Sequence, residues 1–252
     1  MAERRAACAV NAPLISIGFL ATGESEAAII GDARSARIGY HSAMSLIMEN
    51  DSTARTLHHL KALLRAKVIA ARDALSEPER RERSLVIVEM IIASPDFGAA
   101  STVLLTSSFG SEVRTSGLIE QTIDGVKKLL LPLVNKEAKM LELYEVGDPQ
   151  SQLERGTYGI AEPRPERCRR AGSDEVDWVL VPGVVFADNG YRIGYGGGYY
   201  DRLLPLLPAA APRVSAAFQL QRRHQVPHGF HDQKIDVIVT EAGVERVSVQ
   251  RI

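Results

Sequence analysis

A glycine-dense segment that contains an arginine and an aspartate is the strongest candidate for chemistry in this chain. It reads Gly190-Tyr-Arg-Ile-Gly-Tyr-Gly-Gly-Gly-Tyr-Tyr-Asp201, follows an apolar run and precedes the apolar start of a helix. Glycine adopts positive φ and lets backbone N–H groups approach an anion, and a helix N-terminus adds unpaired donors. The segment therefore predicts a phosphate cradle, in which Arg192 supplies a positive charge and Asp201 holds a divalent cation against the phosphates.

A second set of cations is predicted on a helix much earlier in the chain. Apolar residues from Leu57 to Leu75 recur at helical spacing, which predicts an amphipathic helix. Lys61 and Arg65 lie one turn apart on one face of it, and Arg72 lies two turns further along. These cations either reach a bound phosphate or form an ordinary solvated face, and the residue pattern leaves both readings open.

Beyond this helix, strands and helices are predicted to alternate. Ser76 and Glu79 have the spacing of a capping box, which predicts a second helix ending near Ala93. Apolar and alternating runs predict a helix at 116–126 and strands at 102–106, 128–134, 140–144, 178–186, 213–218, 237–240 and 244–249. This order predicts one Rossmann-like α/β domain of three layers, with a mostly parallel sheet and helices on both faces. Ligands of such sheets bind beyond the carboxyl ends of strands, where the glycine segment and Ser107–Thr115 are expected to meet.

Residues 1–55 differ from the rest of the chain, because they show no sustained helical or alternating period. They are expected to be a poorly ordered N-terminal extension without a catalytic role. An organelle presequence is an alternative, and so is an over-extended start, since Met44 and Met48 lie just before the regular pattern begins. The α/β domain is expected to occupy residues 56–252.

Composition limits the classes of function. A chain of 252 residues with 45% hydrophobic residues is long enough for one substantial core. With 30 basic and 31 acidic residues, the net charge of −1 favours no polyanion, so nucleic acid is not expected as a partner. Two cysteines suit a reducing compartment, and no apolar run reaches the length of a bilayer span. The chain is therefore expected to be a cytoplasmic protein, and we also expect it to be a monomer.

The glycine segment, together with the preceding Pro182-Gly-Val-Val-Phe186, closely resembles the signature of the 5-formyltetrahydrofolate cyclo-ligase family, also called 5,10-methenyltetrahydrofolate synthetases. The resemblance extends over residues 57–245 in separate blocks. Besides the glycine segment, these blocks are Lys61-x-x-x-Arg65, Gly110-Ser-Glu-Val-Arg-Thr115, Tyr158-Gly-Ile-Ala-Glu-Pro163, and Pro227-His-Gly-Phe-His-Asp232 with the following Ile235–Glu241. The chain departs from the family pattern at Thr106, where an aromatic residue is common, and at Arg114, where an acidic or small polar residue is common. Both departures bear on the fit of the folate rather than on the ATP chemistry.

The resemblance implies a ligase of one-carbon (folate) metabolism that uses ATP and Mg²⁺ to convert 5-formyltetrahydrofolate into 5,10-methenyltetrahydrofolate, with release of ADP and phosphate through a phosphorylated formyl group. It implies that the catalytic cations are Lys61, Arg65 and Arg192. It implies ATP binding by Lys61, Ala62, Leu63, Leu64, Arg65, Arg192, Ile193, Gly194, Tyr195, Gly196, Gly197, Gly198, Tyr199 and Tyr200. It implies folate binding by Ser107, Glu112, Tyr195, Gly196, Gly197, Gly198 and Tyr199, and Mg²⁺ binding by Asp201 and Asp232.

Some of these residues also have an ordinary structural interpretation. A carboxylate such as Glu112 can accept two parallel hydrogen bonds from an aminopyrimidinone edge, but it can also cap the helix that follows. Tyr199 and Tyr200 either contact the ligands or pack at the helix start. Glu162-Pro163 is expected to be a structural turn, and the histidines near the C-terminus lack the spacing of a zinc site.

Two alternative functions stay open at this point. One is a different ATP-dependent kinase or ligase on the same scaffold, which the substitutions at Thr106 and Arg114 motivate. The other is a non-catalytic nucleotide- or folate-binding relative. The metal pair Asp201 and Asp232 speaks against the second, because a binding protein does not need it.

Overall fold

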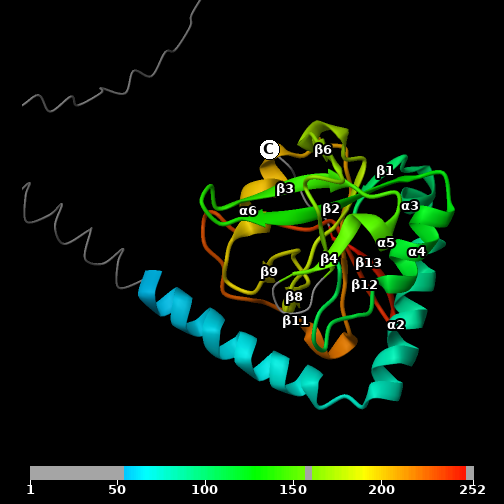
Figure 1. The fold of residues 1–252 in the computed structure, drawn as a ribbon. Coiled ribbons are helices and arrows are strands. Elements are labelled where there is room, and N and C mark those ends of the chain that lie inside the picture. The colour runs from blue at the N-terminus through cyan, green and yellow to red at the C-terminus, as the bar shows by residue number, and fades with distance from the viewer. Residues whose placement is uncertain (1–53, 157–160, 248–252) are drawn as a thin grey trace, which may run out of the picture. The chain divides into compact units, whose positions relative to one another are not determined.

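An eight-stranded sheet forms the centre of the computed structural model, which describes residues 54–156 and 161–247. Its strand order is β13-β12-β10-β7-β1-β2-β3-β6 (Figure 1). The strands are β1 Thr102–Leu104, β2 Lys128–Asn135, β3 Met140–Glu145, β6 Arg169–Ala171, β7 Trp178–Leu180, β10 Arg213–Ala216, β12 Val237–Thr240 and β13 Gly243–Arg246. The consecutive strands β12, β10, β7, β1 and β2 are parallel, whereas β13, β3 and β6 pair antiparallel at the two sides. The prediction of a mostly parallel α/β sheet is confirmed.

Helices cover both faces of this sheet, as a three-layer domain requires. Successive strand side chains point to opposite faces, so Val103 and Leu129 belong to one core cluster and Leu104 and Leu130 to another. The first cluster is closed by α2 (Glu77–Ile92) and α4 (Ser116–Asp124). The second is closed by α6 (Tyr199–Leu203) and the 3₁₀ turn η3 (Leu204–Leu206). Figure 1 shows α2 and α4 on one side of the sheet and α6 on the other.

The start of α2 follows from its sequence. Ser76 is the N-cap, and its hydroxyl accepts a hydrogen bond from the backbone N–H of Glu79 at 3.4 Å. The carboxylate of Glu79 accepts one from the backbone N–H of Ser76 at 3.1 Å, which completes the capping box. The helix ends one residue before Ala93, as its pattern predicts. Two shorter helices, α3 (Pro95–Ala99) and α5 (Pro149–Gln152), and the small sheet of β4 (Leu153–Arg155) and β5 (Ala161–Pro163) complete this side.

The first described helix, residues 54–73, packs on a second small sheet. This sheet has the order β11-β8-β9, with bounds Arg222–Arg223, Val185–Ala187 and Arg192–Ile193. Val68 of the helix is fully buried against Val185 and Ile193. In Figure 1 the helix runs from blue to cyan beside these strands. It therefore lies alongside the strand that leads into the glycine segment.

The prediction of one buried strand over 178–186 is wrong. The chain leaves the main sheet after Leu180 and enters the small sheet at Val185. Proline has no N–H to donate to a ladder, so Pro182 ends the pairing of β7. At Gly183 an added Cβ would lie 2.7 Å from the Phe186 ring, so the bend needs glycine. The apolar run predicted burial correctly but did not reveal the break.

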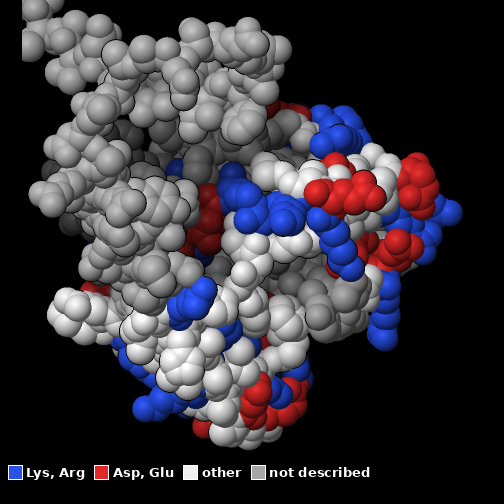
Figure 2. Space-filling model, turned by 90° about the vertical axis from the view of Figure 1, so that its left-hand side faces the viewer, with Lys and Arg blue, Asp and Glu red and all other residues white. Residues whose placement is uncertain are grey.

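The predicted extension over residues 1–55 falls outside the described residues, except that positions 54 and 55 already belong to the first helix. No helix in the described part of the chain is long and apolar enough to cross a membrane. On the face shown in Figure 2, acidic and basic side chains are interspersed. That distribution agrees with the near-zero net charge.

Candidate active site

A cavity of about 370 Å³ opens where the order of the sheet reverses. After β1 the chain continues to β2 on one side, whereas β7 lies on the other side of β1. Thr106 and Ser107 follow β1, Pro182 follows β7, and all three line the cavity. Ligands of parallel α/β sheets bind at such a reversal, and ligand pockets typically measure about 300 to 1,000 Å³. The cavity is therefore the candidate active site.

The glycine segment forms one wall of this cavity. It connects β9 to α6, and every residue from 192 to 201 lines the cavity. Gly196 has φ 106° and Gly198 has φ 66°, conformations that side chains with a Cβ rarely adopt. The helix that follows is only five residues long, so the N-terminal donors predicted for it come from one short turn. The predicted phosphate cradle thus depends on the glycine backbone itself.

The cations of the first helix reach the same wall. Arg65 Nε donates a hydrogen bond to the carbonyl of Gly194 at 2.7 Å, and Lys61 forms an ion pair with Asp232. Both cations line the cavity. The residues between them do not, because the helical period turns them elsewhere. Ala62 is not a lining residue, Leu63 is 56% exposed, and Leu64 packs toward the small sheet, so no cavity contact supports their implied part in ATP binding.

Arg192 is a buried cation at the start of the glycine segment, and three groups of the protein hold its side chain. Its side chain is buried, and its guanidinium donates to the carbonyls of Pro182 at 3.3 Å and of Gln233 at 2.7 Å. It also forms an ion pair with Asp201 at 3.1 Å. Because Arg192 is buried and has three partners, its position is fixed. It can therefore contribute positive charge to the site, but it is not free to move toward a ligand.

The two predicted metal ligands line one cavity, and each is already engaged. Asp201 accepts a hydrogen bond from the backbone N–H of Gln233 at 3.0 Å in addition to its pair with Arg192. Asp232 accepts one from the backbone N–H of Gly229 at 2.6 Å in addition to its pair with Lys61. Residues 54–156 and 161–247 hold no cluster of three or more metal-ligating side chains. Two carboxylates fit a Mg²⁺ that brings phosphate oxygens and waters as its other ligands.

Glu112 occupies the opposite side of the cavity. One carboxylate oxygen accepts a hydrogen bond from the Tyr195 hydroxyl at 2.6 Å, and the other accepts one from the backbone N–H of Phe109 at 3.0 Å. Burial raises the pKa of the Glu112 carboxyl, while the hydrogen bonds and the charge of Arg72 oppose that shift. The alternative role as a helix cap is wrong, because the N-cap of α4 is Thr115. Glu112 instead faces the cavity, as a ligand contact would.

The remaining predicted contacts lie around the same cavity. Ser107 lines it and donates a hydrogen bond to the carbonyl of Ala161 at 3.1 Å. Tyr199 lies under the guanidinium of Arg202, 5.1 Å from its ring centroid. Burial raises the pKa of the Tyr200 hydroxyl, so this group stays a neutral phenol at the cavity wall. All three positions are therefore compatible with packing and with ligand contact, and their implied ligand roles stay predictions.

Several lining residues were not predicted. Pro132, Val134 and Leu141 add apolar surface to the cavity, which Phe109 also lines. Pro132 and Val134 share a strand face with Leu130, so the alternation of β2 combined with the position of the cavity would have indicated them. Such a surface suits an aromatic ring beside a polar head group.

Glu162 was interpreted as part of a structural turn, and that interpretation is wrong. It lies in β5, which pairs with β4, and its side chain lines the cavity. An added Cβ at Gly156 would lie 2.0 Å from the Glu162 carboxylate, so a larger residue there would force this flexible side chain to move. Residues 157–160, which carry the start of the family-like block, lie outside the described residues.

The two departures from the family pattern have different positions. Thr106 lines the cavity beside Tyr200, so it can affect what the cavity accepts. Arg114 does not line it, but forms an ion pair with Glu77 on the surface. The expectation that Arg114 bears on the fit of the folate is therefore not supported by its position, while that for Thr106 stands.

Comparisons with known proteins agree with this geometry. The model of the 5-formyltetrahydrofolate cyclo-ligase family matches residues 58–241. A probable 5-formyltetrahydrofolate cyclo-ligase of Schizosaccharomyces pombe is 28% identical over 200 residues, covering 74% of this chain and 97% of the relative. The 5-formyltetrahydrofolate cyclo-ligase of Escherichia coli K12 is 31% identical over 133 residues, covering 53% of this chain and 73% of the relative.

The fold is also found among solved structures. The NMR structure of Aquifex aeolicus 5,10-methenyltetrahydrofolate synthetase superposes with a TM-score of 0.67 at 36% identity, covering 77% of this chain and 95% of that one. The chain belongs to the 5-formyltetrahydrofolate cyclo-ligase family, whose members are ligases of folate metabolism. Membership implies a folate substrate and ATP as co-substrate.

Proposed function

We propose that this enzyme closes the ring of 5-formyltetrahydrofolate to 5,10-methenyltetrahydrofolate at the expense of ATP, in a reaction that depends on Mg²⁺. The observation that carries the proposal is the meeting of two unlike walls in one cavity. The glycine segment with Lys61 and Arg65 offers backbone donors and positive charge, which suit a triphosphate. Glu112 with the apolar residues of β2 offers a carboxylate beside a hydrophobic wall, which suits a pterin and the ring attached to it.

The chemistry explains why both ligands must meet. A formamide oxygen is a poor leaving group, so direct attack of nitrogen 10 on the formyl carbon is slow. In the proposed reaction the formyl oxygen attacks the γ-phosphorus, and the bond from that phosphorus to the β-phosphate oxygen breaks to release ADP. Nitrogen 10 then attacks the formyl carbon and loses its proton, and the carbon–oxygen bond breaks to release phosphate. The product retains the positive charge of the methenyl bridge.

The chain's own residues would position the reactants and neutralise charge, which is most of what phosphoryl transfer requires. Arg65 orients the glycine segment through Gly194, and Lys61 faces the incoming phosphates from the same helix. Arg192 stabilises negative charge from its buried position. Asp201 and Asp232 would hold Mg²⁺, which would supply further charge neutralisation at the phosphates. No nucleophilic side chain is needed, because the substrate's own oxygen attacks.

A spectroscopic assay tests this proposal. The purified protein is mixed with 5-formyltetrahydrofolate, ATP and Mg²⁺, and the absorbance of the methenyl product is followed together with phosphate release. We expect product only when all three components are present, with one phosphate released for each ring closed. Turnover of ATP with a non-folate acceptor, or tight folate binding without turnover, would contradict the proposal and select one of the alternative functions. The cytoplasmic location and the monomeric state remain predictions, and an Arabidopsis thaliana relative is described as mitochondrial.

A further inference from the structure

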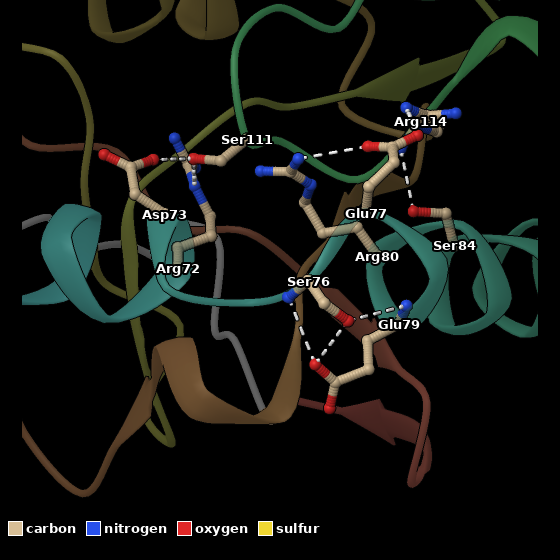
Figure 3. A network of polar contacts seen from close by, with 9 residues as sticks. All are labelled: Arg72, Asp73, Ser76, Glu77, Glu79, Arg80, Ser84, Ser111 and Arg114. Carbon is tan, nitrogen blue, oxygen red and sulfur yellow. Dashed lines mark hydrogen bonds and ion pairs between the residues drawn. The ribbon is translucent and has the colours of Figure 1, made fainter.

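Arg72 is a buried cation that the proposed reaction leaves without a role. It lies in the last turn of the first helix, is 3% exposed, and does not line the large cavity. Its Nε donates a hydrogen bond to the Ser111 hydroxyl at 2.9 Å, and that hydroxyl donates to Asp73. Figure 3 shows Arg72, Asp73 and Ser111 joined in this way. Burying a charged guanidinium costs free energy unless hydrogen-bond partners compensate for the lost water, so the identity of these partners shows what the burial serves.

The second partner of the Arg72 side chain leads into the active site. Its Nη2 donates a hydrogen bond to the Tyr195 hydroxyl at 3.0 Å, and the same hydroxyl donates to Glu112 at 2.6 Å. Arg72 and Glu112 also line one small cavity of about 20 Å³, which shares Thr106, Glu112 and Pro182 with the main one. The cation therefore faces the carboxylate through a single bridging phenol.

Tyr195 joins the two walls of the cavity. Its backbone lies between Gly194 and Gly196, in the wall proposed for the phosphates, while its hydroxyl reaches Glu112 in the wall proposed for the folate. Its ring packs on Phe109 with centroids 5.0 Å apart. The Tyr195 side chain therefore ties the glycine segment to Glu112, in addition to the hydrogen bond by which Arg65 holds Gly194.

We infer that Arg72 is a positioning residue for the proposed reaction: it anchors the Tyr195 hydroxyl and thereby holds Glu112 and the glycine segment in the arrangement that receives both ligands. The expected effect of Arg72 on folate binding rests on the proposed function, whereas the hydrogen bonds that join Arg72, Tyr195 and Glu112 do not depend on it. Ser111 and Asp73 fix the guanidinium from behind, so the anchor is set before any ligand binds.

Electrostatics support the same role. The ionisable groups that act on Glu112 or are acted on by it are Arg72, Tyr195 and Tyr200. Burial raises the pKa of Glu112, and of this set only Arg72 carries a positive charge that lowers it. A protonated carboxyl could not accept two hydrogen bonds from an aminopyrimidinone edge on equal terms. Loss of Arg72 should therefore raise the pKa of Glu112 and weaken folate binding together.

The first test compares Arg72→Met with Arg80→Met. Arg80 is a matched control, because it lies on the neighbouring helix, pairs with Glu77 at 3.0 Å and has no contact with the cavity; Figure 3 shows both arginines. For Arg72→Met we expect the KM for 5-formyltetrahydrofolate to rise about 10- to 100-fold, with a smaller change in the KM for ATP. Arg80→Met should leave both unchanged. Equal losses for the two substrates, or no loss, would overturn the inference.

A double-mutant cycle keeps the test decisive if Arg72→Met does not fold. Arg72→Lys retains a charge and bulk but loses the paired geometry of the guanidinium. If Arg72 acts through the Tyr195 hydroxyl, Arg72→Lys should raise the folate KM in the wild-type protein and add little in a Tyr195→Phe background. Fully additive effects of the two changes would show that Arg72 acts by another route.

A titration without any ligand separates this inference from the proposed function. The carboxyl carbon of Glu112 is followed by ¹³C NMR over pH in the wild type, Arg72→Met and Arg80→Met. We expect the midpoint to move to higher pH in Arg72→Met alone. An unchanged midpoint would overturn the inference, whereas failure of the wild type to turn over folate would overturn only the proposed function.

Discussion

The two walls of the active site differ in how their charges are arranged before a ligand arrives. On the phosphate side two cations are paired with carboxylates, Lys61 with Asp232 and Arg192 with Asp201, while Arg65 is bonded to the carbonyl of Gly194. On the folate side one carboxylate, Glu112, is held by a hydroxyl and a backbone N–H, and it has no ion pair with another of the described residues. From this comparison we expect a nucleotide with its metal to break the ion pairs of the phosphate side when it binds. The folate side, in contrast, is already arranged for its ligand.

This difference predicts that the largest single effect lies on the phosphate side, at the metal. We expect Asp201→Asn to lower kcat about 10²- to 10³-fold, because the amide retains an oxygen for Arg192 and Gln233 but loses the charge needed for Mg²⁺. Asparagine is preferable to alanine here, since alanine would leave the buried Arg192 without its carboxylate and would also destabilise the fold. The measurement is kcat at saturating Mg²⁺, with the thermal midpoint as the folding control. A near-normal kcat for Asp201→Asn would show that Asp201 is not a ligand of the catalytic Mg²⁺.

On the folate side a single hydrogen-bonding group should dominate binding. We expect Glu112→Gln to weaken 5-formyltetrahydrofolate binding about 10- to 100-fold with little change for ATP. A carboxylate accepts hydrogen bonds at both of its oxygens, whereas a glutamine amide accepts at only one. Isothermal titration of each ligand separately provides the two affinities. If both affinities fell by the same factor, Glu112 would not be a dedicated folate contact.

Loss of a phosphate-side cation should have a smaller effect, because its charge is partly neutralised before binding. We expect Lys61→Met to weaken ATP binding about 10-fold, since nucleotide binding must first break the pair with Asp232. Lys67→Met is the matched control: it lies on the same helix, is exposed and does not line the cavity. A similar loss of ATP affinity in both variants would point to a general field rather than to a contact.

The buried carboxylate should also leave a mark on stability. The raised pKa of Glu112 means that the folded state holds the proton more tightly than the unfolded chain. The free energy of unfolding is therefore highest below the ordinary pKa of 4.5 and falls as the pH rises through the raised pKa. Glu112→Gln lacks this titration. Its Tm relative to the wild type should therefore increase as the pH rises from 4.5 through the raised pKa of Glu112. A difference in Tm that stays constant or shrinks with pH would argue against the burial of this carboxylate.

The smallest effect is expected for a residue that belongs to neither wall. Arg114 is close in sequence to Glu112, but it forms an exposed ion pair with Glu77. Exposed pairs of this kind contribute little, so Arg114→Ala should change the folate KM by less than about twofold. Steady-state kinetics checks this, and a larger change would return Arg114 to the folate site.

The sequence predicted most of the parallel sheet, because its buried strands are short apolar runs between recognisable helix starts such as Ser76. It also predicted Lys61 and Arg65 as a pair, since their spacing places both on the side of the helix that faces Gly194. It could not reveal the break at Pro182 and Gly183, because an apolar run predicts burial without saying which of two sheets buries it. Glu162 reaches the cavity through the pairing of β5 with β4, which the local pattern does not encode, and the alternation of β2 indicates Pro132 only once the position of the cavity is known.

Arg72 illustrates the same limit in another way. A long arginine on a helix flank usually covers apolar surface, and nothing in its neighbours distinguishes it. Its partners Ser111 and Tyr195 come from segments that only the folded chain brings together.

The most direct test of the account follows the formyl oxygen. 5-Formyltetrahydrofolate labelled with ¹⁸O in the formyl group is converted with ATP and Mg²⁺, and the released phosphate is analysed by mass spectrometry. If both ligands meet in the cavity and the formyl oxygen attacks the γ-phosphorus, one ¹⁸O atom appears in each phosphate formed. Recovery of unlabelled phosphate alongside methenyl product would contradict a phosphorylated formyl group, and with it the role assigned to the meeting of the two walls.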